Sequence, residues 1–135
     1  MKRYTADTIA LLGYLADSLP KSVDTVFREA ERGEAEIIIP SICIGEVIYT
    51  ILKGREMFGV KIPRSKIELF IDLLKESRGI RVVDLELDSW KILLEIDLPE
   101  LHDRMIVVTH IQEETEAIIT NDEEISKLKG IKTVW

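Results

Sequence analysis

The fold of this chain follows from one stretch of its sequence, Glu36-Ile37-Ile38-Ile39-Pro40-Ser41-Ile42-Cys43-Ile44-Gly45-Glu46. Its first part, residues 36–40, is a run of β-branched residues that predicts a buried strand. Ser41 suits the N-cap of a helix, and the residues after it keep a helical period, so we expect a helix over 41–55. A buried strand that runs directly into a helix is typical of an α/β fold.

The same alternation continues on both sides of this stretch. The residues from Arg3 to Asp7 are few, but further β-branched runs follow at 80–84, 117–120 and 132–135. Helical periods cover 8–19, 24–32, 64–77, 89–96, 102–114 and 122–129. Short apolar strands alternating with amphipathic helices predict a parallel sheet covered on both sides. We find no linker that would divide residues 1–135 into more than one domain.

The composition agrees with a single globular domain. Of the 135 residues, 46% are hydrophobic and 32% are charged, a balance unlike that of disordered chains. The apolar stretch from Ile9 to Ala16 is too short for a membrane span, so we expect no membrane association. Cys43 is the only cysteine, which excludes an intrachain disulfide and a cysteine-based zinc site and fits a reducing cytoplasm. We expect Cys43 to be buried.

Charge is distributed unevenly along the chain. The net charge of −7 argues against a protein that coats nucleic acid through its overall charge. The stretch from Lys53 to Lys66, called the basic stretch below, nevertheless holds five basic residues and one acid. Asp84 to Asp103 holds seven acids and one lysine. An acidic protein of this kind can still present one basic face.

Four acidic residues stand where the predicted elements meet. Asp7 closes the first strand, and Asp122 follows the strand at 117–120 by two residues. Because ligands bind at the carboxyl ends of parallel strands, both should point to the same end of the sheet. Glu46 falls in the second turn of its helix among uncharged neighbours, and Asp103 begins a helix on a face that borders the core.

Carboxylates gathered at one end of a sheet repel one another and raise each other's pKa values. A divalent cation resolves this repulsion. Oxygen ligands without thiolates or a pair of histidines favour Mg²⁺ or Mn²⁺ over zinc. A site of this kind can activate water and stabilise the charge that develops on a phosphodiester, as metal-dependent nucleases do.

At these residues the chain resembles the PIN domain, and in its size it is similar to the single-domain toxin ribonucleases usually called VapC. The resemblance spans nearly the whole chain and rests on four segments in the family order. These are Ala6-Asp7-Thr8, Pro40-Ser41-Ile42-Cys43-Ile44-Gly45-Glu46, Leu101-His102-Asp103-Arg104 and Ile119-Thr120-Asn121-Asp122. Each segment alone is weak, but the ordered set is specific.

The resemblance implies a three-layer α/β/α sandwich with a central parallel sheet of about five strands. It also implies a Mg²⁺- or Mn²⁺-dependent endoribonuclease that is the toxin of a toxin–antitoxin pair, with RNA as substrate, an antitoxin protein as partner and a homodimeric assembly. The residues carried over as catalytic are Asp7, Glu46, Asp103, Asp122 and Thr120. Asp7, Glu46 and Asp103 would ligate metal directly, and Asp122 would bind a second ion or hold a bound water. Thr120 would steady a carboxylate or phosphate oxygen.

Structural roles compete with this assignment of the acids. Asp7 and Asp122 suit helix N-caps with or without chemistry. Glu46 could extend to solvent or pair with a lysine, and Asp103 could pair with Arg104 or cap its helix. These interpretations lose force when the four acids are taken together and in order.

The remaining candidate residues have simpler structural explanations. We leave His102 and His110 out of the catalytic set, because no Ser or Cys nucleophile motif accompanies them. Trp90 and Trp135 are assigned to the core or to an interface, since no aromatic cluster surrounds them. The basic stretch is either an ordinary solvated helix end and loop or an edge that contacts RNA, and the sequence leaves both open.

Other functions of a similar sheet fit less well. A phosphoacceptor signalling domain would have an acidic pair at the first strand, and a phosphatase with an Asp nucleophile would have a second Asp at the position of Ile9. Two alternatives stay open: a PIN-like binding or scaffold module without turnover, and a housekeeping RNA-processing nuclease.

Overall fold

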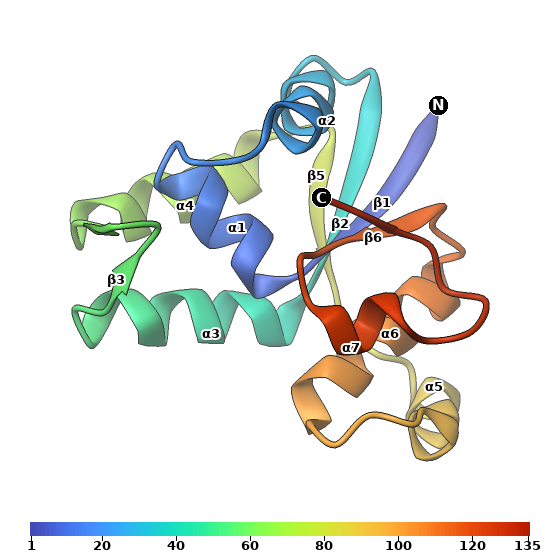
Figure 1. Ribbon diagram of the computed structural model, residues 1–135. Coiled ribbons are helices and arrows are strands. Elements are labelled where there is room, and N and C mark those ends of the chain that lie inside the picture. The colour runs from blue at the N-terminus through green and yellow to red at the C-terminus, as the bar shows by residue number, and fades with distance from the viewer.

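The computed structural model describes residues 1–135, and its centre is a five-stranded sheet (Figure 1). The strands lie in the order β5-β2-β1-β6-β7, and every neighbouring pair is parallel. Their bounds are β1 Lys2–Ala6, β2 Ala35–Pro40, β5 Ile80–Val83, β6 Ala117–Ile119 and β7 Thr133–Val134. The predicted parallel sheet of about five strands is therefore confirmed.

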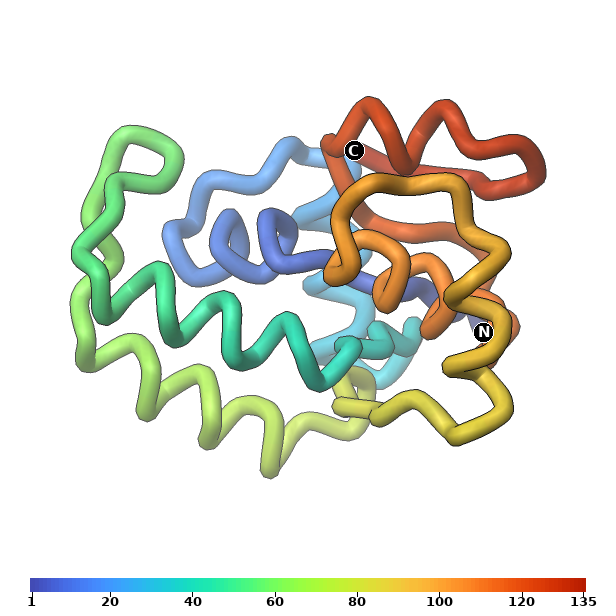
Figure 2. The backbone as a smooth tube through the Cα atoms, turned by 90° about the horizontal axis from the view of Figure 1, so that it is seen from below, coloured from blue at the N-terminus to red at the C-terminus, as the bar shows by residue number.

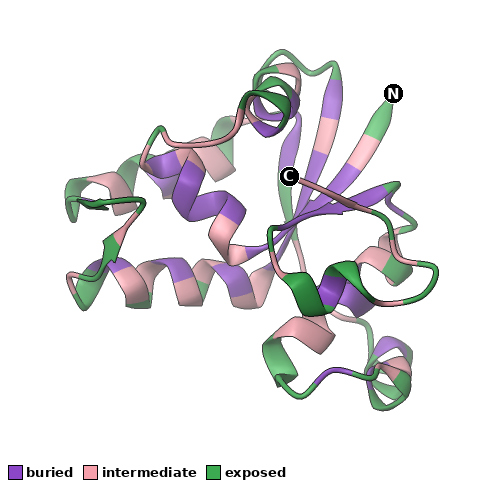
Figure 3. Ribbon diagram, viewed as in Figure 1, coloured by how far each residue is buried: buried purple, intermediate pink, exposed green.

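Seven α-helices flank the sheet (Figure 2). They are α1 Thr8–Leu15, α2 Lys21–Glu31, α3 Ser41–Leu52, α4 Ser65–Glu76, α5 Leu87–Ile92, α6 Leu101–Glu113 and α7 Glu123–Ser126, and a short 3-10 helix follows α5 at Leu93–Glu95. Successive residues of a strand face opposite sides of a sheet, and Ile37, Ile38 and Ile39 of β2 are all fully buried. Figure 3 shows buried residues in the strands of the sheet and on the helices that pack against it. Helices thus cover both faces, and the predicted three-layer α/β/α sandwich is confirmed.

The order of the strands reverses at β1. From β1 the chain passes to β2 on one side, and after β5 it returns to β6 on the other side. The backbone N–H of Asp7 donates to the carbonyl oxygen of Ile119 over 3.2 Å, which holds the ends of β1 and β6 side by side. In parallel α/β sheets such a reversal opens a crevice at the carboxyl edge, where ligands bind.

Several helix boundaries differ from the sequence prediction; α2 begins at Lys21 rather than at residue 24, and α3 ends at Leu52 rather than at residue 55. α1 ends at Leu15 rather than at residue 19, because Asp17 adopts the left-handed backbone conformation that terminates helices (φ 53°). The prediction that Ser41 caps α3 is wrong, since Pro40 occupies the N-cap position and makes no side-chain cap. The last helix comprises Glu123–Ser126 and is shorter than the predicted 122–129.

A short antiparallel hairpin lies within the basic stretch, where the sequence pattern predicts no strands. It pairs β3 Glu56–Met57 with β4 Val60–Lys61. The two turn residues, Phe58 and Gly59, both have positive φ, as a type I′ hairpin turn requires. The Phe58 ring packs closely against α1 at Gly13. Gly13 has no side chain, and a Cβ atom placed there would lie only 3.2 Å from the Phe58 Cζ atom. This contact fixes the hairpin to α1.

The cysteine and the two tryptophans differ in their burial. Cys43 is buried in α3, as predicted, and Trp135 packs against the hydrophobic core. Trp90 on α5 lies outside that core and is 42% exposed. None of the helices combines the length and the apolar character that crossing a membrane requires.

Candidate functional site

A cavity of about 690 Å³ lies where β1, β2 and β6 end and the following helices begin. Its lining includes all four acids singled out in the sequence. The lining residues are Asp7, Thr8, Ile9, Leu12, Ile42, Gly45, Glu46, Tyr49, Thr50, Arg55, Met57, His102, Asp103, Ile106, Asn121 and Asp122. Residues from distant parts of the chain therefore share one concave site, as the parallel sheet predicts.

Asp7 is the most deeply buried of these acids, with 4% of its surface exposed. Its Oδ1 atom accepts a hydrogen bond of 2.8 Å from the Ala10 N–H, so it caps α1. The pKa of Asp7 is raised from 3.8 to about 6, mainly by burial and also by the charges of Asp103 and Asp122, while hydrogen bonding from Thr120 and Ala10 lowers it. Asp7 is both a helix cap and part of an acidic cavity.

Asp122, which follows β6, is likewise both a helix cap and an acid of the cavity. Its Oδ1 atom accepts a hydrogen bond of 3.0 Å from the Ile125 N–H and caps α7. Its own N–H donates to Oγ1 of Thr120 over 3.0 Å. Thr120 is buried and does not line the cavity, but it accepts this hydrogen bond from Asp122 and also lowers the pKa of Asp7.

Asp103 is the third residue of α6, and neither structural alternative applies to it. Glu100 occupies the N-cap position, and the guanidinium of Arg104 donates to backbone carbonyl groups instead of pairing with Asp103. Burial, together with the charges of Asp122 and Glu46, raises the pKa of Asp103 to about 6. An acid in such surroundings binds a cation readily.

Glu46 is oriented by two polar side chains from other helices. The Thr8 hydroxyl donates a hydrogen bond of 2.7 Å to its Oε1 atom, and Nδ1 of His102 lies 2.9 Å from its Oε2 atom. No lysine pairs with it. His102, which the sequence analysis leaves out, thus belongs to the site, whereas His110 hydrogen-bonds Thr115 away from the cavity.

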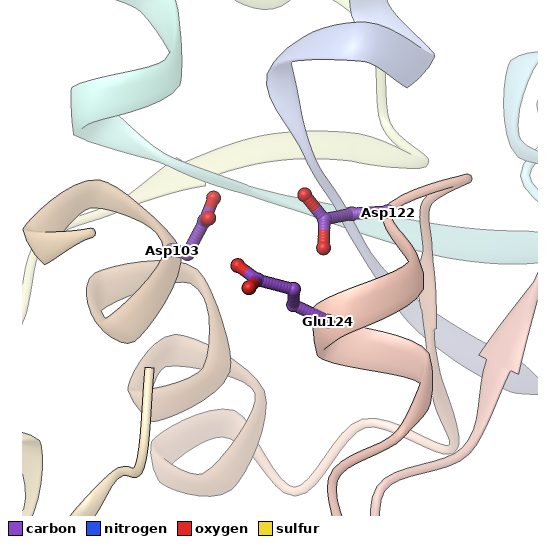
Figure 4. Close-up of side chains that lie close together, drawn as sticks. All are labelled: Asp103, Asp122 and Glu124. Atoms are coloured by element: carbon purple, nitrogen blue, oxygen red, sulfur yellow. The ribbon is translucent and has the colours of Figure 1, made fainter. Parts of the chain in front are cut away.

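Glu124 is an acid of the site that the sequence analysis does not single out. One carboxylate oxygen from each of Asp103, Asp122 and Glu124 lies within 4.8 Å of the others (Figure 4). Glu124 is exposed and belongs to the acidic run Asp122-Glu123-Glu124, a pattern typical of a solvent-exposed surface. Its spacing of two residues from a helix-capping acid is the signal that sequence reasoning could have used.

The donor set fits a hard divalent cation. Every candidate ligand is a carboxylate oxygen, and the buried Cys43 thiol has a pKa raised by burial, so it is not a thiolate ligand. Oxygen-only sites suit Mg²⁺, Mn²⁺ or Ca²⁺ rather than zinc. A bound cation would relieve the repulsion between these closely spaced carboxylates, which raises their pKa values.

The family model described as the PIN domain matches residues 4–131. No curated protein matches the sequence.

The solved structures that share the fold include three from toxin–antitoxin systems. VapBC2 from Rickettsia felis, bound to a DNA fragment from its promoter, is 16% identical with a TM-score of 0.69, and the match covers 98% of this chain and 97% of that chain. A toxin–antitoxin complex from Klebsiella pneumoniae is 17% identical with a TM-score of 0.64, covering 98% and 96%. VapC20 of Mycobacterium tuberculosis, a toxin that cleaves the sarcin-ricin loop, is 10% identical with a TM-score of 0.60, covering 88% and 89%.

Proposed function

Because the chain belongs to the PIN-domain family, we propose that it is a Mg²⁺- or Mn²⁺-dependent endoribonuclease that hydrolyses RNA phosphodiester bonds. The observation that carries this proposal is the gathering of Asp7, Glu46, Asp103 and Asp122 around one cavity at the carboxyl edge of the sheet. Two of these acids, Asp7 and Asp103, have pKa values raised to about 6, which indicates a site built for a positive charge.

The residues that would hold the metal are those whose oxygens already lie together. Asp103, Asp122 and Glu124 form the closest group, and Asp7 and Glu46 line the adjoining cavity. A divalent ion bound there would supply a Lewis acid that lowers the pKa of water and neutralises charge on a phosphodiester. Two ions are compatible with the number of acids.

The other polar residues of the site would act by orientation. Thr120 accepts a hydrogen bond from the Asp122 N–H and lowers the pKa of Asp7. Thr8 of α1 and His102 of α6 each contact one of the two carboxylate oxygens of Glu46. Hydrogen bonds of this kind fix ligand geometry and affect metal affinity strongly when they are removed.

We further propose that the chain is the toxin of a toxin–antitoxin pair, with an antitoxin protein as its partner, as a homodimer in the cytoplasm. Support comes from the length match, since the compared VapC and toxin–antitoxin structures are covered almost end to end. A neighbouring reading frame for a small DNA-binding protein would favour this assignment over a housekeeping RNA-processing nuclease.

The test is a cleavage assay on single-stranded RNA with Mg²⁺, with Mn²⁺ and with EDTA. We expect cleavage only with a divalent ion, and loss of cleavage in Asp103→Asn with the fold unchanged by circular dichroism. Cleavage by Asp103→Asn at the wild-type rate would contradict the proposal. Metal binding without RNA cleavage would favour a scaffold module.

A further inference from the structure

We infer that Arg55 binds an RNA phosphate next to the scissile one and thereby positions the substrate over the acidic site, an inference that rests on the proposed function. Among the sixteen lining residues of the cavity, Arg55 is the only lysine or arginine. A polyanion that enters an acidic cavity needs a cationic anchor on the protein as well as a bound metal. Arg55 is the one fixed positive charge in that position.

The end of α3 brings Arg55 back over the cavity. Gly54 adopts the left-handed conformation (φ 67°), its N–H donates to the carbonyl of Ile51, and the Arg55 N–H donates to the carbonyl of Thr50. This pair of hydrogen bonds is a Schellman motif, which reverses the chain direction at a helix end. The reversal places Arg55 beside the helix it has just left rather than beyond it.

An aromatic ring then holds the guanidinium in place. The Cζ atom of Arg55 lies 5.4 Å from the centre of the Tyr49 ring, and Nζ of Lys53 lies 5.5 Å from it. Both distances are those of cation–π contacts. Tyr49 also lines the cavity and lies three residues after Glu46, on the same face of α3. The guanidinium is therefore placed about one helical turn along α3 from the acidic site.

The guanidinium is held but its hydrogen-bond donors are free. No carboxylate lies within ion-pair distance of Arg55, and its side chain donates to no protein acceptor. Arg3 and Arg81, by contrast, are engaged by Glu36. A cation–π contact leaves the planar edge of a guanidinium available for the bidentate hydrogen bonds that bind phosphate.

The hairpin supports this arrangement from the other side. β3 begins at the residue after Arg55, and Met57 of β3 lines the cavity as well. Phe58 adopts a left-handed conformation that is costly for an aromatic residue, and its ring packs against α1 at Gly13. The segment that carries Arg55 is thus fixed at both ends, by the cap at Gly54 and by the hairpin.

The experiment compares Arg55→Gln with Lys53→Gln, a matched variant that loses the same charge over the same ring but outside the cavity lining. RNA affinity is measured by fluorescence anisotropy of a short labelled single-stranded RNA in EDTA, so that no cleavage occurs, over a range of salt concentrations. Mn²⁺ affinity is measured separately by calorimetry. Arg55→Lys, which keeps the charge but not the bidentate geometry, completes the set.

Arg55→Gln should weaken RNA binding about tenfold and lower the slope of log affinity against log salt by about 0.7, the value for one phosphate contact on a single strand. Its KM for RNA cleavage should rise with a smaller change in kcat, and its Mn²⁺ affinity should not fall. Lys53→Gln should change RNA affinity much less, and Arg55→Lys should restore most of the salt slope.

Equal effects of Arg55→Gln and Lys53→Gln would overturn the inference, because bulk charge would then explain them. Wild-type RNA affinity in Arg55→Gln, or undetectable RNA binding by the wild type, would overturn it as well. These results are distinguishable from a failure of the proposed function. If Arg55→Gln loses RNA binding, the inference is supported even if the wild type does not cleave RNA. If Arg55→Gln cleaves RNA like the wild type, the inference about Arg55 fails while the proposed nuclease activity stands.

Discussion

The Thr8 hydroxyl donates a hydrogen bond of 2.7 Å to Oε1 of Glu46, so the first residue of α1 orients an acid on α3. Thr8 follows directly after Asp7, which caps the same helix. The start of α1 therefore places one acid by its own side chain and a second acid through a neighbour. A carboxylate fixed in this way loses little conformational freedom when it binds a ligand.

Replacing Thr8 with Val should weaken the site without unfolding the protein. The change removes the hydroxyl but keeps the shape, and the partly buried Glu46 loses a donor. We expect Mn²⁺ affinity or RNA cleavage to fall by about tenfold or more, as for the loss of other hydrogen bonds to metal ligands. Thr8→Ser keeps the hydroxyl and should behave like the wild type. Equal activity of Thr8→Val and Thr8→Ser would rule out this role.

His102 should matter through Glu46 rather than as a general base. Its Nδ1 atom lies 2.9 Å from Oε2 of Glu46, and the ring is half exposed. His102→Ala should reduce Mn²⁺ affinity severalfold, whereas His102→Asn, whose amide can replace the Nδ1 donor, should retain most of it. Complete loss of cleavage in both variants, with metal affinity intact, would instead assign His102 a direct catalytic role.

Glu124 should contribute to metal binding, although the sequence gives it no special place. Its carboxylate lies with those of Asp103 and Asp122, while the adjacent Glu123 is outside this group. Calorimetry should show that Glu124→Gln lowers Mn²⁺ affinity by about tenfold or more, an effect comparable to loss of a supporting ligand. Glu123→Gln removes the same charge one residue away and serves as the control. Indistinguishable Mn²⁺ affinities of the two variants would exclude Glu124 from the site.

The metal-free protein should lose stability as pH rises through the range in which Asp7 ionises. Burial raises the pKa of Asp7 in the folded state to about 6, above the ordinary 3.8, so the folded state holds the proton more tightly than the unfolded state. This contribution is favourable below about pH 4 and is lost as pH rises to about 6. The difference corresponds to a free energy of unfolding on the order of 3 kcal/mol.

Urea denaturation in EDTA measures this effect in Asp7→Asn against the wild type. Asn caps helices as well as Asp does, so the variant should keep the fold and remove only the buried charge. At pH 7 Asp7→Asn should be the more stable protein, and near pH 4 the difference should shrink. Mn²⁺ at pH 7 should stabilise the wild type more than the variant. A stability difference that stays the same at both pH values would be inconsistent with a buried, ionising Asp7.

Much of the site follows from the sequence because its residues are tied to regular elements. Asp7 directly follows β1, and Asp122 comes shortly after the β-branched run of β6, and strands of a parallel sheet bring such ends together. Glu46 and Asp103 interrupt apolar helical faces, where an unpaired acid is costly. The order and spacing of these segments also carried the resemblance to the family, and the fold agrees with it.

The remaining features depend on contacts that no local pattern encodes. Glu124 lies in a charged run, and only the placement of α7 beside the start of α6 brings it to Asp103 (Figure 4). The hydrogen bond of His102 to Glu46 joins residues that are 56 positions apart. The strands of the hairpin have two residues each, too few for a period to appear. Tertiary packing decides all three.

The most direct test of the central claim is a crystal structure of the protein grown with Mn²⁺, with the ion located by anomalous scattering. The account predicts a manganese peak coordinated by carboxylate oxygens of Asp103 and Asp122, with Asp7, Glu46 or Glu124 completing the shell directly or through water. An empty cavity in crystals of a protein that cleaves RNA under the same Mn²⁺ concentration would contradict it.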